Sequence, residues 1–377
     1  MKILHINSYY STSGFYKNLY DKQIEEGYDI DVFVPVSTNQ NSINIDLGTY
    51  TTLKVNHGKY DRFVFYYKHN KIYKDIISTH SISNYSITHA HSLFSNGFIS
   101  MKLKLQFGTP YIVAVRNTDV NIFFKYFFHL RKLGVKILNQ AEKVIFLSKS
   151  YRDFVINNYI PLENREEFLT KCEIIPNGID RYWIENKGVL KKISEETLKI
   201  IYVGVIDKNK NILTTIKALN ILRKKGINIV FTVVGRIVDK SIYEQIKEIP
   251  YLNYLGQKTK EELINIYRDN DIFIMPSITE TFGLVYAEAM SQGLPVIYSK
   301  GQGFDDQFKE GEVGFHVDCF NPNEIVNRIY DIISTYELIS ERCLDNSSEF
   351  DWNTINLEYK RIYNKCSLNE FRTEKLI

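Results

Sequence analysis

Two glutamates frame a polar turn in the second half of the chain and offer the clearest chemistry in the sequence. Glu280 lies in the turn that follows an apolar strand ending at Pro276, and Glu288 lies in a helix expected to begin near Gly283. Helical side chains tilt toward the N-terminus, so Glu288 is expected to lean back toward the helix start. Free N–H groups in the first helical turn form an anion site, and a glycine there lets a ligand approach the backbone.

An anion on those amides, with a carboxylate on either side, fits a sugar nucleotide. The diphosphate would take the amides, and the hydroxyl groups on both sides would donate to Glu280 and Glu288. The simpler alternative is that a glutamate near a helix start only complements the helix dipole. The pair alone leaves both interpretations open.

A second group of candidates follows a strand expected near 85–90. His89 and His91 share one face in alternation, and His91 would project at the carboxyl end of the strand. The H-x-H spacing could suggest a metal, but no further ligand cluster follows in the sequence, so we expect no metal. A satisfied core histidine remains the alternative for His89.

The elements that must position these side chains are short apolar, β-branched strands alternating with amphipathic helices. This alternation predicts parallel α/β folds in both halves. We expect strands near 2–7, 29–34, 85–90, 111–115 and 143–147, and then near 198–203, 228–234, 251–255, 271–275 and 294–298. Helices are expected between them, for example over Ile212–Lys225.

Turn residues interrupt a strand at Ile174–Asp180, close to the midpoint, and give the best domain boundary. We therefore expect an N-terminal domain over 1–178 and a C-terminal domain over 179–350. The segment 351–377 is expected to form a helix that crosses back to the N-terminal domain. Two doubly wound domains would present the carboxyl ends of their sheets across a cleft, where such folds bind ligands.

Composition narrows the class of protein. The 377 residues are 44% hydrophobic, and no window approaches the ~20 apolar residues of a membrane-spanning helix. The apolar start is too short for a secretory signal, and four widely spaced cysteines suit a reducing compartment, so a cytoplasmic protein is expected. A net charge of +3 is too small to indicate a nucleic-acid partner.

Charge is unevenly distributed along the chain. Residues 1–180 carry 21 Lys and Arg against 16 Asp and Glu, whereas the remainder carries 26 against 28. The basic excess in the first half suits solvated lysines, an anionic acceptor or an anionic membrane surface, and the charges alone do not separate these.

The stretch around the glutamates resembles the family 4 glycosyltransferases of the GT-B fold, and the resemblance covers nearly the whole chain. The shared signature is two glutamates separated by seven residues with Phe-Gly-Leu between them, after a strand ending in Pro-Ser. The resemblance implies a retaining, metal-independent enzyme that uses a nucleotide sugar, with UDP favoured. It implies that Glu280 binds donor-sugar hydroxyls, that Glu288 binds the ribose, and that the amides around Phe282–Leu284 (Phe282, Gly283 and Leu284) hold the diphosphate.

A second phosphate-binding element is expected after the strand over 198–203. The family usually places an arginine directly after the glycine here and a lysine five positions later. Lys210 fits the second position, but Val205 replaces the arginine, so Lys208 or Arg236 would have to substitute. The same resemblance points His91 at the donor sugar across the cleft.

The remaining expectations concern the first half. The resemblance places a glycine-rich loop near the donor phosphates, and here only Gly14 is present. Three polar side chains after the strand near 111–115 are interpreted as acceptor recognition: Arg116, Asn117 and Asp119. Asn121–Lys132 is expected to be one aromatic helix with basic flanks, either packed on the sheet or touching lipid.

Other classes fit less well. A dehydrogenase would need G-x-G-x-x-G after its first strand, and the nearest match, at Gly301–Asp306, lacks the third glycine. A metal-dependent transferase of the GT-A type would need Asp-x-Asp after a strand. The two candidates, Asp29-Ile30-Asp31 and Asp269-Asn270-Asp271, are both expected to precede a strand. A GT-B sugar-nucleotide epimerase and a catalytically silent GT-B subunit stay open as alternatives.

The leading expectation is transfer of a hexose or N-acetylhexosamine to a glycan or polyprenyl-linked acceptor in cell-surface polysaccharide assembly, with peripheral contact to an anionic membrane.

Overall fold

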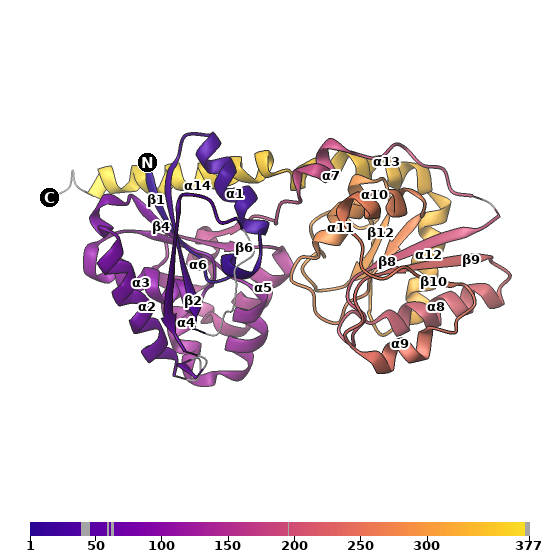
Figure 1. Cartoon of the computed structure of the whole chain (residues 1–377), viewed down its shortest axis with the longest axis horizontal. Helices are drawn as coiled ribbons and strands as arrows, with labels where there is room; N and C mark the ends of the chain where they lie inside the picture. The colour runs from indigo at the N-terminus through magenta and orange to yellow at the C-terminus, as the bar shows by residue number, and fades with distance from the viewer. Residues whose placement is uncertain (39–45, 59, 62–63, 195, 374–377) are drawn as a thin grey trace. The chain divides into compact units, whose positions relative to one another are not determined.

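The computed structural model describes residues 1–38, 46–58, 60–61, 64–194 and 196–373, and the chain divides into two compact units. Each unit is built on its own parallel sheet, so the predicted fold class is confirmed at the level of two parallel α/β sheets (Figure 1). Unit 1 comprises Met1–Leu147, Arg152–Ile175 and Trp352–Ile377, and unit 2 comprises Ser148–Tyr151 and Pro176–Asp351.

The sheet of unit 1 has seven parallel strands in the order β3-β2-β1-β4-β5-β6-β7. The order changes direction between β1 and β4, and doubly wound sheets bind ligands at the carboxyl ends of the strands near such a point. The strands are β1 Lys2–Ile6, β2 Asp29–Ser37, β3 Thr51–His57, β4 Ile87–Ala90, β5 Tyr111–Ala114, β6 Lys143–Phe146 and β7 Cys172–Ile174.

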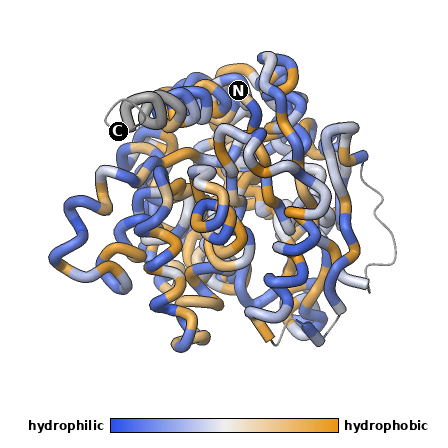
Figure 2. The backbone as a smooth tube through the Cα atoms, turned by 90° about the vertical axis from the view of Figure 1, so that its left-hand side faces the viewer, coloured by the Kyte–Doolittle hydropathy of each residue, from blue (hydrophilic) through white to orange (hydrophobic). Residues whose placement is uncertain are grey.

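Helices cover both faces of this sheet because its strands alternate their side chains between two cores. Ile3 packs with α1 and α14, whereas its neighbour Leu4 packs with α2 and α3. In the tube view, hydrophobic stretches of the backbone gather toward the inside and hydrophilic stretches are more frequent along the outside (Figure 2). The helices of the unit are α1 Phe15–Glu25, α2 Phe65–Thr79, α3 Ser95–Phe107, α4 Arg131–Gln140, most of α5 Lys149–Tyr159, α6 Arg165–Lys171 and α14 Trp352–Thr373.

The sheet of unit 2 has six parallel strands in the order β10-β9-β8-β11-β12-β13. Its strands are β8 Leu198–Val203, β9 Ile229–Val234, β10 Leu252–Tyr254, β11 Ile272–Ile274, β12 Val296–Ser299 and β13 Gly314–Val317. Its helices are α7 Arg181–Glu185, α8 Ile212–Lys224, α9 Lys240–Ile246, α10 Lys260–Arg268, α11 Leu284–Ser291, α12 Pro322–Ser334 and α13 Tyr336–Asn346.

The single aromatic helix expected over Asn121–Lys132 is wrong. A π-helical turn over Asp119–Phe124 and a 3-10 turn over Phe128–Leu130 precede α4, which begins only at Arg131. The rings are held by separate partners, with Phe123 stacked on Phe94 and Phe124 stacked on Tyr159. Because neighbouring rings pack against different parts of the unit, the segment forms short turns and not one regular amphipathic helix. In the described ranges, no helix combines the length and apolarity that crossing a bilayer requires.

Candidate functional site

The turns after β8 and β11 are fixed to each other by two asparagines. Asn209 Nδ2 donates to the Thr279 carbonyl at 2.9 Å, and Asn209 Oδ1 accepts from the Thr279 N–H at 3.0 Å. Asn211 adopts a left-handed conformation, with φ of 56°, and its amide donates to the Pro276 carbonyl at 3.1 Å. These bonds hold the turn that carries Lys210 against the turn that carries Glu280.

Lys210 and Glu280 form an ion pair between these turns. The Lys210 Nζ donates to the Glu280 carboxylate, and the two side chains are only 20% and 12% exposed. The Glu280 N–H donates to Gln302 Oε1 at 2.9 Å, and its carboxylate accepts from the Thr281 N–H at 3.1 Å. The pair is therefore ordered before any ligand binds, and a diphosphate could share the Lys210 ammonium without large rearrangement.

The start of α11 has the geometry of an anion cradle. Gly283 caps the helix with φ of +77°, and a Cβ at this position would collide with the Tyr286 ring. Gly283 is therefore required both by its backbone conformation and by the space around it. Throughout the described part of the chain, no group accepts a hydrogen bond from the N–H groups of Phe282, Gly283 or Leu284. The N–H groups of the half-buried Gly283 and Leu284 are available to an anionic ligand, whereas Phe282 is only 1% exposed.

Glu288 lies half-buried in α11, and no described residue forms a hydrogen bond or ion pair with its carboxylate. Desolvation, with a contribution from the nearby Asp180 charge, raises the pKa of Glu288 to about 7. An unpaired, desolvated carboxylate is costly, so hydroxyl donors from a ligand would stabilise its ionised form.

Two further cations lie on the turns after β8 and β9. Lys208 and Arg236 are exposed, and the described residues provide neither with an ion-pair partner. The two turns continue side by side beyond the strands, because the Ile206 N–H donates to the Arg236 carbonyl at 2.9 Å and Ile206 bridges to Ile237. Arg236 therefore lies on the turn adjacent to Val205, where the expected arginine is missing.

In unit 1, His91 follows the carboxyl end of β4, but its ring is fully buried. His91 Nε2 lies 3.0 Å from His5 Nδ1, and His89 Nδ1 lies 2.8 Å from the Tyr363 hydroxyl. Desolvation holds the pKa of both His89 and His91 well below the ordinary value, so these rings are neutral. His89 is a core histidine with a hydrogen-bond partner, which is the alternative stated above.

His5, His89 and His91 bring one ring nitrogen each within 4.8 Å of one another, and sequence reasoning missed His5. The geometry does not suit a shared metal. The rings of His89 and His91 stack 4.1 Å apart at an interplanar angle of 20°. Because a ligating imidazole holds the metal near its own ring plane, two nearly parallel stacked rings cannot both ligate one ion without rotating.

The other first-half candidates occupy different environments. Asp119 is buried, and its carboxylate accepts from the N–H groups of Leu93 and Phe94 at 2.9 and 3.1 Å, and from that of Arg116 at 2.9 Å. Asp119 therefore orders the start of α3. The largely buried Arg116 donates from Nε to the His91 carbonyl at 3.4 Å.

Asn117 is half-buried and accepts a hydrogen bond from the Asn121 amide at 2.5 Å. Gly14 precedes α1 with an ordinary φ of −64°, so its backbone conformation does not require glycine. None of these residues belongs to the unit that carries Lys210, Glu280 and Glu288. The structure thus places the second-half candidates on the turns after β8, β9 and β11 and at α11, and the first-half candidates in the other unit.

Two family models match the chain, one in each half. Residues 15–182 match the family described as Glycosyltransferase Family 4, and residues 185–347 match the family described as Glycosyl transferases group 1. An uncharacterized glycosyltransferase of Methanocaldococcus jannaschii is 24% identical over 79% of each chain. A capsular polysaccharide biosynthesis glycosyltransferase of Staphylococcus aureus is 28% identical over 57% of this chain and 58% of its own.

Solved structures show the same fold. Sucrose-phosphate synthase from Thermosynechococcus elongatus is 18% identical, with a TM-score of 0.76 over 97% of this chain and 98% of that one. Anabaena HepE in complex with UDP-glucose is 17% identical, with a TM-score of 0.67 over 97% and 100% of the two chains. The protein is a glycosyltransferase with the GT-B fold. The chain belongs to the group 1 and family 4 glycosyltransferases, as the E-x7-E signature indicated.

Proposed function

We propose that the protein is a retaining glycosyltransferase that transfers a hexose or N-acetylhexosamine from a nucleotide sugar, most simply a UDP-sugar, to a glycan or polyprenyl-linked acceptor. The observation that carries this proposal is the ordered Lys210–Glu280 pair beside the unoccupied amides at the start of α11. The HepE complex supports UDP as the nucleotide. The capsular relative supports a place in capsule or lipopolysaccharide assembly.

The donor would bind unit 2 by its three chemical parts. Its diphosphate accepts from the amides of Phe282–Leu284 and from Lys210, its ribose donates to Glu288, and its sugar hydroxyls donate to Glu280. Arg236 and Lys208 add positive charge beside the diphosphate in place of the arginine missing at Val205. No metal is needed in this scheme, because ammonium, guanidinium and amide groups neutralise the phosphates.

During transfer, the bond between the anomeric carbon and the diphosphate oxygen breaks, and the acceptor oxygen bonds to that carbon on the same face. The proton of the acceptor hydroxyl passes to the leaving diphosphate oxygen. Negative charge develops on the leaving diphosphate. Lys210 and the α11 amides, fixed before the reaction, would stabilise this charge more than that of the bound donor.

The acceptor would bind unit 1, with Arg116 and Asn117 as contacts, Asp119 as the residue that orders their loop, and the Gly14 turn nearby. His91 is proposed to donate a hydrogen bond to the transferred sugar, which requires its buried ring to become accessible. His91→Ala should then lower turnover more than donor affinity. Equal turnover in that variant, with only a lower unfolding temperature, would assign His91 to the core.

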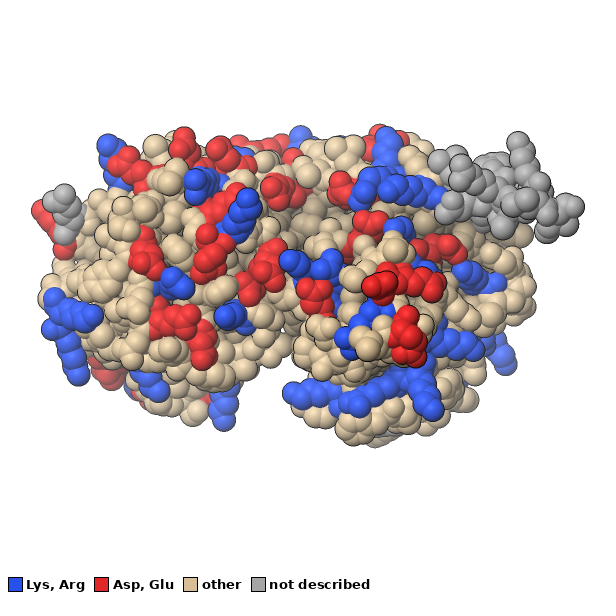
Figure 3. Space-filling view, turned by 180° about the vertical axis from the view of Figure 1, so that it is seen from behind, with Lys and Arg blue, Asp and Glu red and all other residues tan. Residues whose placement is uncertain are grey.

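We also propose that the protein works in the cytoplasm at the inner face of the plasma membrane. Tyr126 and Phe128 are 62% and 65% exposed, and Lys125 and Arg131 flank them. Lys and Arg side chains gather over the lower part of unit 1 (lower right in Figure 3). Exposed aromatic and basic side chains together suit an anionic bilayer surface. Sedimentation with anionic and neutral vesicles tests this, and equal binding to both would contradict it.

The donor is identified by incubating the protein with single sugar nucleotides and measuring slow hydrolysis by mass spectrometry. We expect one UDP-sugar to release UDP and free sugar, and Glu280→Ala to abolish that release. Conversion of the donor to an isomeric sugar nucleotide would favour an epimerase instead. Failure of every sugar nucleotide to bind would contradict the proposal.

A further inference from the structure

A cavity of about 270 Å³ opens at the carboxyl edge of the unit 1 sheet, and none of the site residues named above lines it. Its walls come from the turn after β1, the last residues of β2 and β3, and the first turns of α2 and α3. We call it the β1–β3 pocket. Parallel sheets bind ligands outside the carboxyl ends of their strands. The volume lies just below the ~300–1,000 Å³ range of ligand pockets, so it suits one sugar-sized group.

Lys68, in the first turn of α2, lines the β1–β3 pocket with an uncompensated ammonium. It is half-buried, and within the described ranges it has no ion-pair partner. The nearest acid, Asp61, is already bound by Lys71 at 2.9 Å and by the Gly58 N–H at 2.9 Å. Desolvation lowers the pKa of Lys68 despite the attraction of Asp61. An anionic group in the pocket would offset this cost.

His69 supplies a hydrogen-bond acceptor. Its Nδ1 lies 2.7 Å from the Phe65 carbonyl, and because a carbonyl can only accept, Nδ1 carries the proton. Burial lowers the pKa of His69 to about 3, so the ring is neutral and Nε2 keeps its lone pair. This buried Nε2 has no hydrogen-bond partner in the described structure. A ligand hydroxyl is the donor that fits it.

Asn96, in the first turn of α3, supplies both a donor and an acceptor. It is 1% exposed, and neither its Oδ1 nor its Nδ2 has a partner among the described residues. Buried polar groups are normally hydrogen-bonded, and each group left unpaired costs stability. An unpaired amide in the wall of a cavity is explained when a ligand completes its hydrogen bonds. Hydroxyl groups of Ser8 and Ser95 also line the β1–β3 pocket.

We propose that the β1–β3 pocket binds the acceptor through a polyol that carries one anionic group. Lys68 pairs with the anion, His69 Nε2 accepts from one hydroxyl, and the Asn96 amide bonds to others. The inference deepens the proposed function and rests on it, since it names the chemical class of the acceptor. Phosphate and carboxylate are the two sources of the anion.

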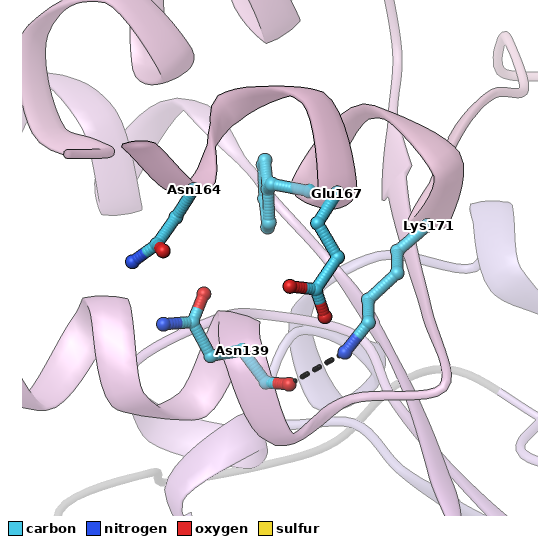
Figure 4. A pocket seen from close by; sticks show the side chains of 5 residues that line it. Asn139, Asn164, Glu167 and Lys171 are labelled. Carbon is cyan, nitrogen blue, oxygen red and sulfur yellow. Dashed lines mark hydrogen bonds between the residues drawn. The ribbon is translucent and has the colours of Figure 1, made fainter. Parts of the chain in front are cut away.

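A second hollow in the same unit shows what an unsuitable cavity looks like. It measures about 150 Å³ and is lined by the residues drawn in Figure 4. Its only drawn ammonium, Lys171, already donates to the Asn139 carbonyl at 2.7 Å. Lys171 therefore serves as the matched control for Lys68, being a lysine of the same unit at a hollow that needs no anion.

Calorimetric titration of the full chain with glucose 6-phosphate, glucuronic acid, glucose and inorganic phosphate tests the proposal. At least one charged sugar should bind about tenfold or more tightly than both glucose and inorganic phosphate. The stronger of the two charged sugars names the anion. Equal binding of glucose, or of inorganic phosphate, would overturn the proposal.

Three variants assign the binding to these residues. Lys68→Met should weaken binding of the charged sugar about tenfold to a hundredfold, whereas Lys171→Met should not change it. Asn96→Ala should weaken the same binding without lowering the unfolding temperature, because it removes an unpaired buried group. If Asn96 were purely structural, Asn96→Ala would lower the unfolding temperature and leave the binding of the charged sugar unchanged. Unchanged affinity in Lys68→Met would overturn the assignment.

Hydrolysis of sugar nucleotides by the same proteins separates this inference from the proposed function. Wild-type protein and the control Lys171→Met should hydrolyse the donor at the same rate. Wild-type protein that binds charged sugars but neither binds nor hydrolyses any sugar nucleotide would refute the proposed function and leave the pocket assignment standing. Donor hydrolysis without binding of charged sugars would refute only the pocket assignment.

Discussion

The carboxyl edges of the two sheets differ in how they present charge. In unit 2, the edge carries Lys210, Glu280 and Glu288, with Lys208 and Arg236 exposed on the adjoining turns. In unit 1, the corresponding edge carries buried histidines and Asn96 together with the buried Arg116 and Asp119, and Lys68 is the only lysine among the described residues that line the β1–β3 pocket. Both edges come from the same kind of parallel sheet.

The difference teaches that the fold supplies the position of a site and the side chains supply its chemistry. A dense set of charges with free amides suits a diphosphate flanked by polyols. Neutral donors and acceptors with one ammonium suit a polyol with one anionic group. The contrast therefore supports the proposal that the donor binds unit 2 and the acceptor binds unit 1.

The strongest test of the contrast between the two sheet edges is a variant that lacks the carboxylate of Glu280. Glu280→Ala should lower transfer by about a hundredfold or more, because it releases Lys210 and removes the contact to the donor sugar. The fold should be retained, since no strand depends on this side chain. Transfer rates at saturating donor measure the effect, with Glu341→Ala, an exposed glutamate of α13, as the control. Near wild-type turnover would remove Glu280 from the site.

A backbone change at the anion cradle should have the next largest effect. Gly283→Ala forces a side chain onto a φ of +77° and into the Tyr286 ring, so we expect a cost of ~1–3 kcal/mol in unfolding free energy and weaker donor binding. Gly226→Ala is the matched control, because its φ is +89° but nothing lies within 4 Å of the added Cβ. The control should lose about 1 kcal/mol and bind donor normally. Equal donor affinity in both variants would contradict the cradle.

Whether Arg236 replaces the arginine that is missing at Val205 can be tested by removing the charge at 236 and placing one at 205. Arg236→Ala should weaken donor binding about tenfold, and adding Val205→Arg should recover part of that loss because the two positions lie on adjacent turns. Lys224→Ala, an exposed lysine at the end of α8, should change nothing. A normal donor affinity in Arg236→Ala would show that the diphosphate is held without this guanidinium.

The smallest expected effect is a pH dependence from Glu288, whose pKa is about 7. Below that pH the carboxyl is protonated and accepts ribose hydroxyls less well, so UDP-sugar affinity should rise a few-fold between pH 6 and pH 8. Glu288→Gln should remove this rise. A pH-independent affinity in the wild-type protein would exclude Glu288 from the ribose contact.

The same carboxyl links pH to stability with a definite sign. Its folded pKa lies above the ordinary value, so the folded chain binds more protons than the unfolded chain between about 4.5 and 7. Stability should fall as pH rises through that window, and Glu288→Gln should remove this part of the fall. Thermal unfolding at several pH values measures it.

Much of this arrangement could be predicted from the sequence, because buried parallel strands leave a strong signal. The strands at β1, β4, β5, β8 and β11 are apolar runs, and each was expected within a few residues of its observed bounds. The edge strand β3 was missed because it is largely exposed and polar, with a Lys54 and two threonines. The edge strand β13 was missed because Gly314 and His316 interrupt its apolar pattern.

The contacts within the candidate site were harder to predict than its members. Glu280 and Lys210 could be named from their motifs, but their ion pair joins residues 70 positions apart in the sequence. The roles of Asn209 and Gln302 depend on how the turns lie against each other, which no local pattern encodes. The same holds for the burial of His91 beside His5. The β1–β3 pocket draws on five separate segments and leaves no compact motif.

The central claim is that the amides opening α11 hold the donor diphosphate between Glu280 and Glu288. A crystal structure of the protein with a UDP-sugar tests it most directly. We predict phosphate oxygens about 3 Å from the amide nitrogens of Phe282–Leu284, the ribose on Glu288 and the sugar on Glu280. A nucleotide bound elsewhere, with those amides facing only water, would contradict the account.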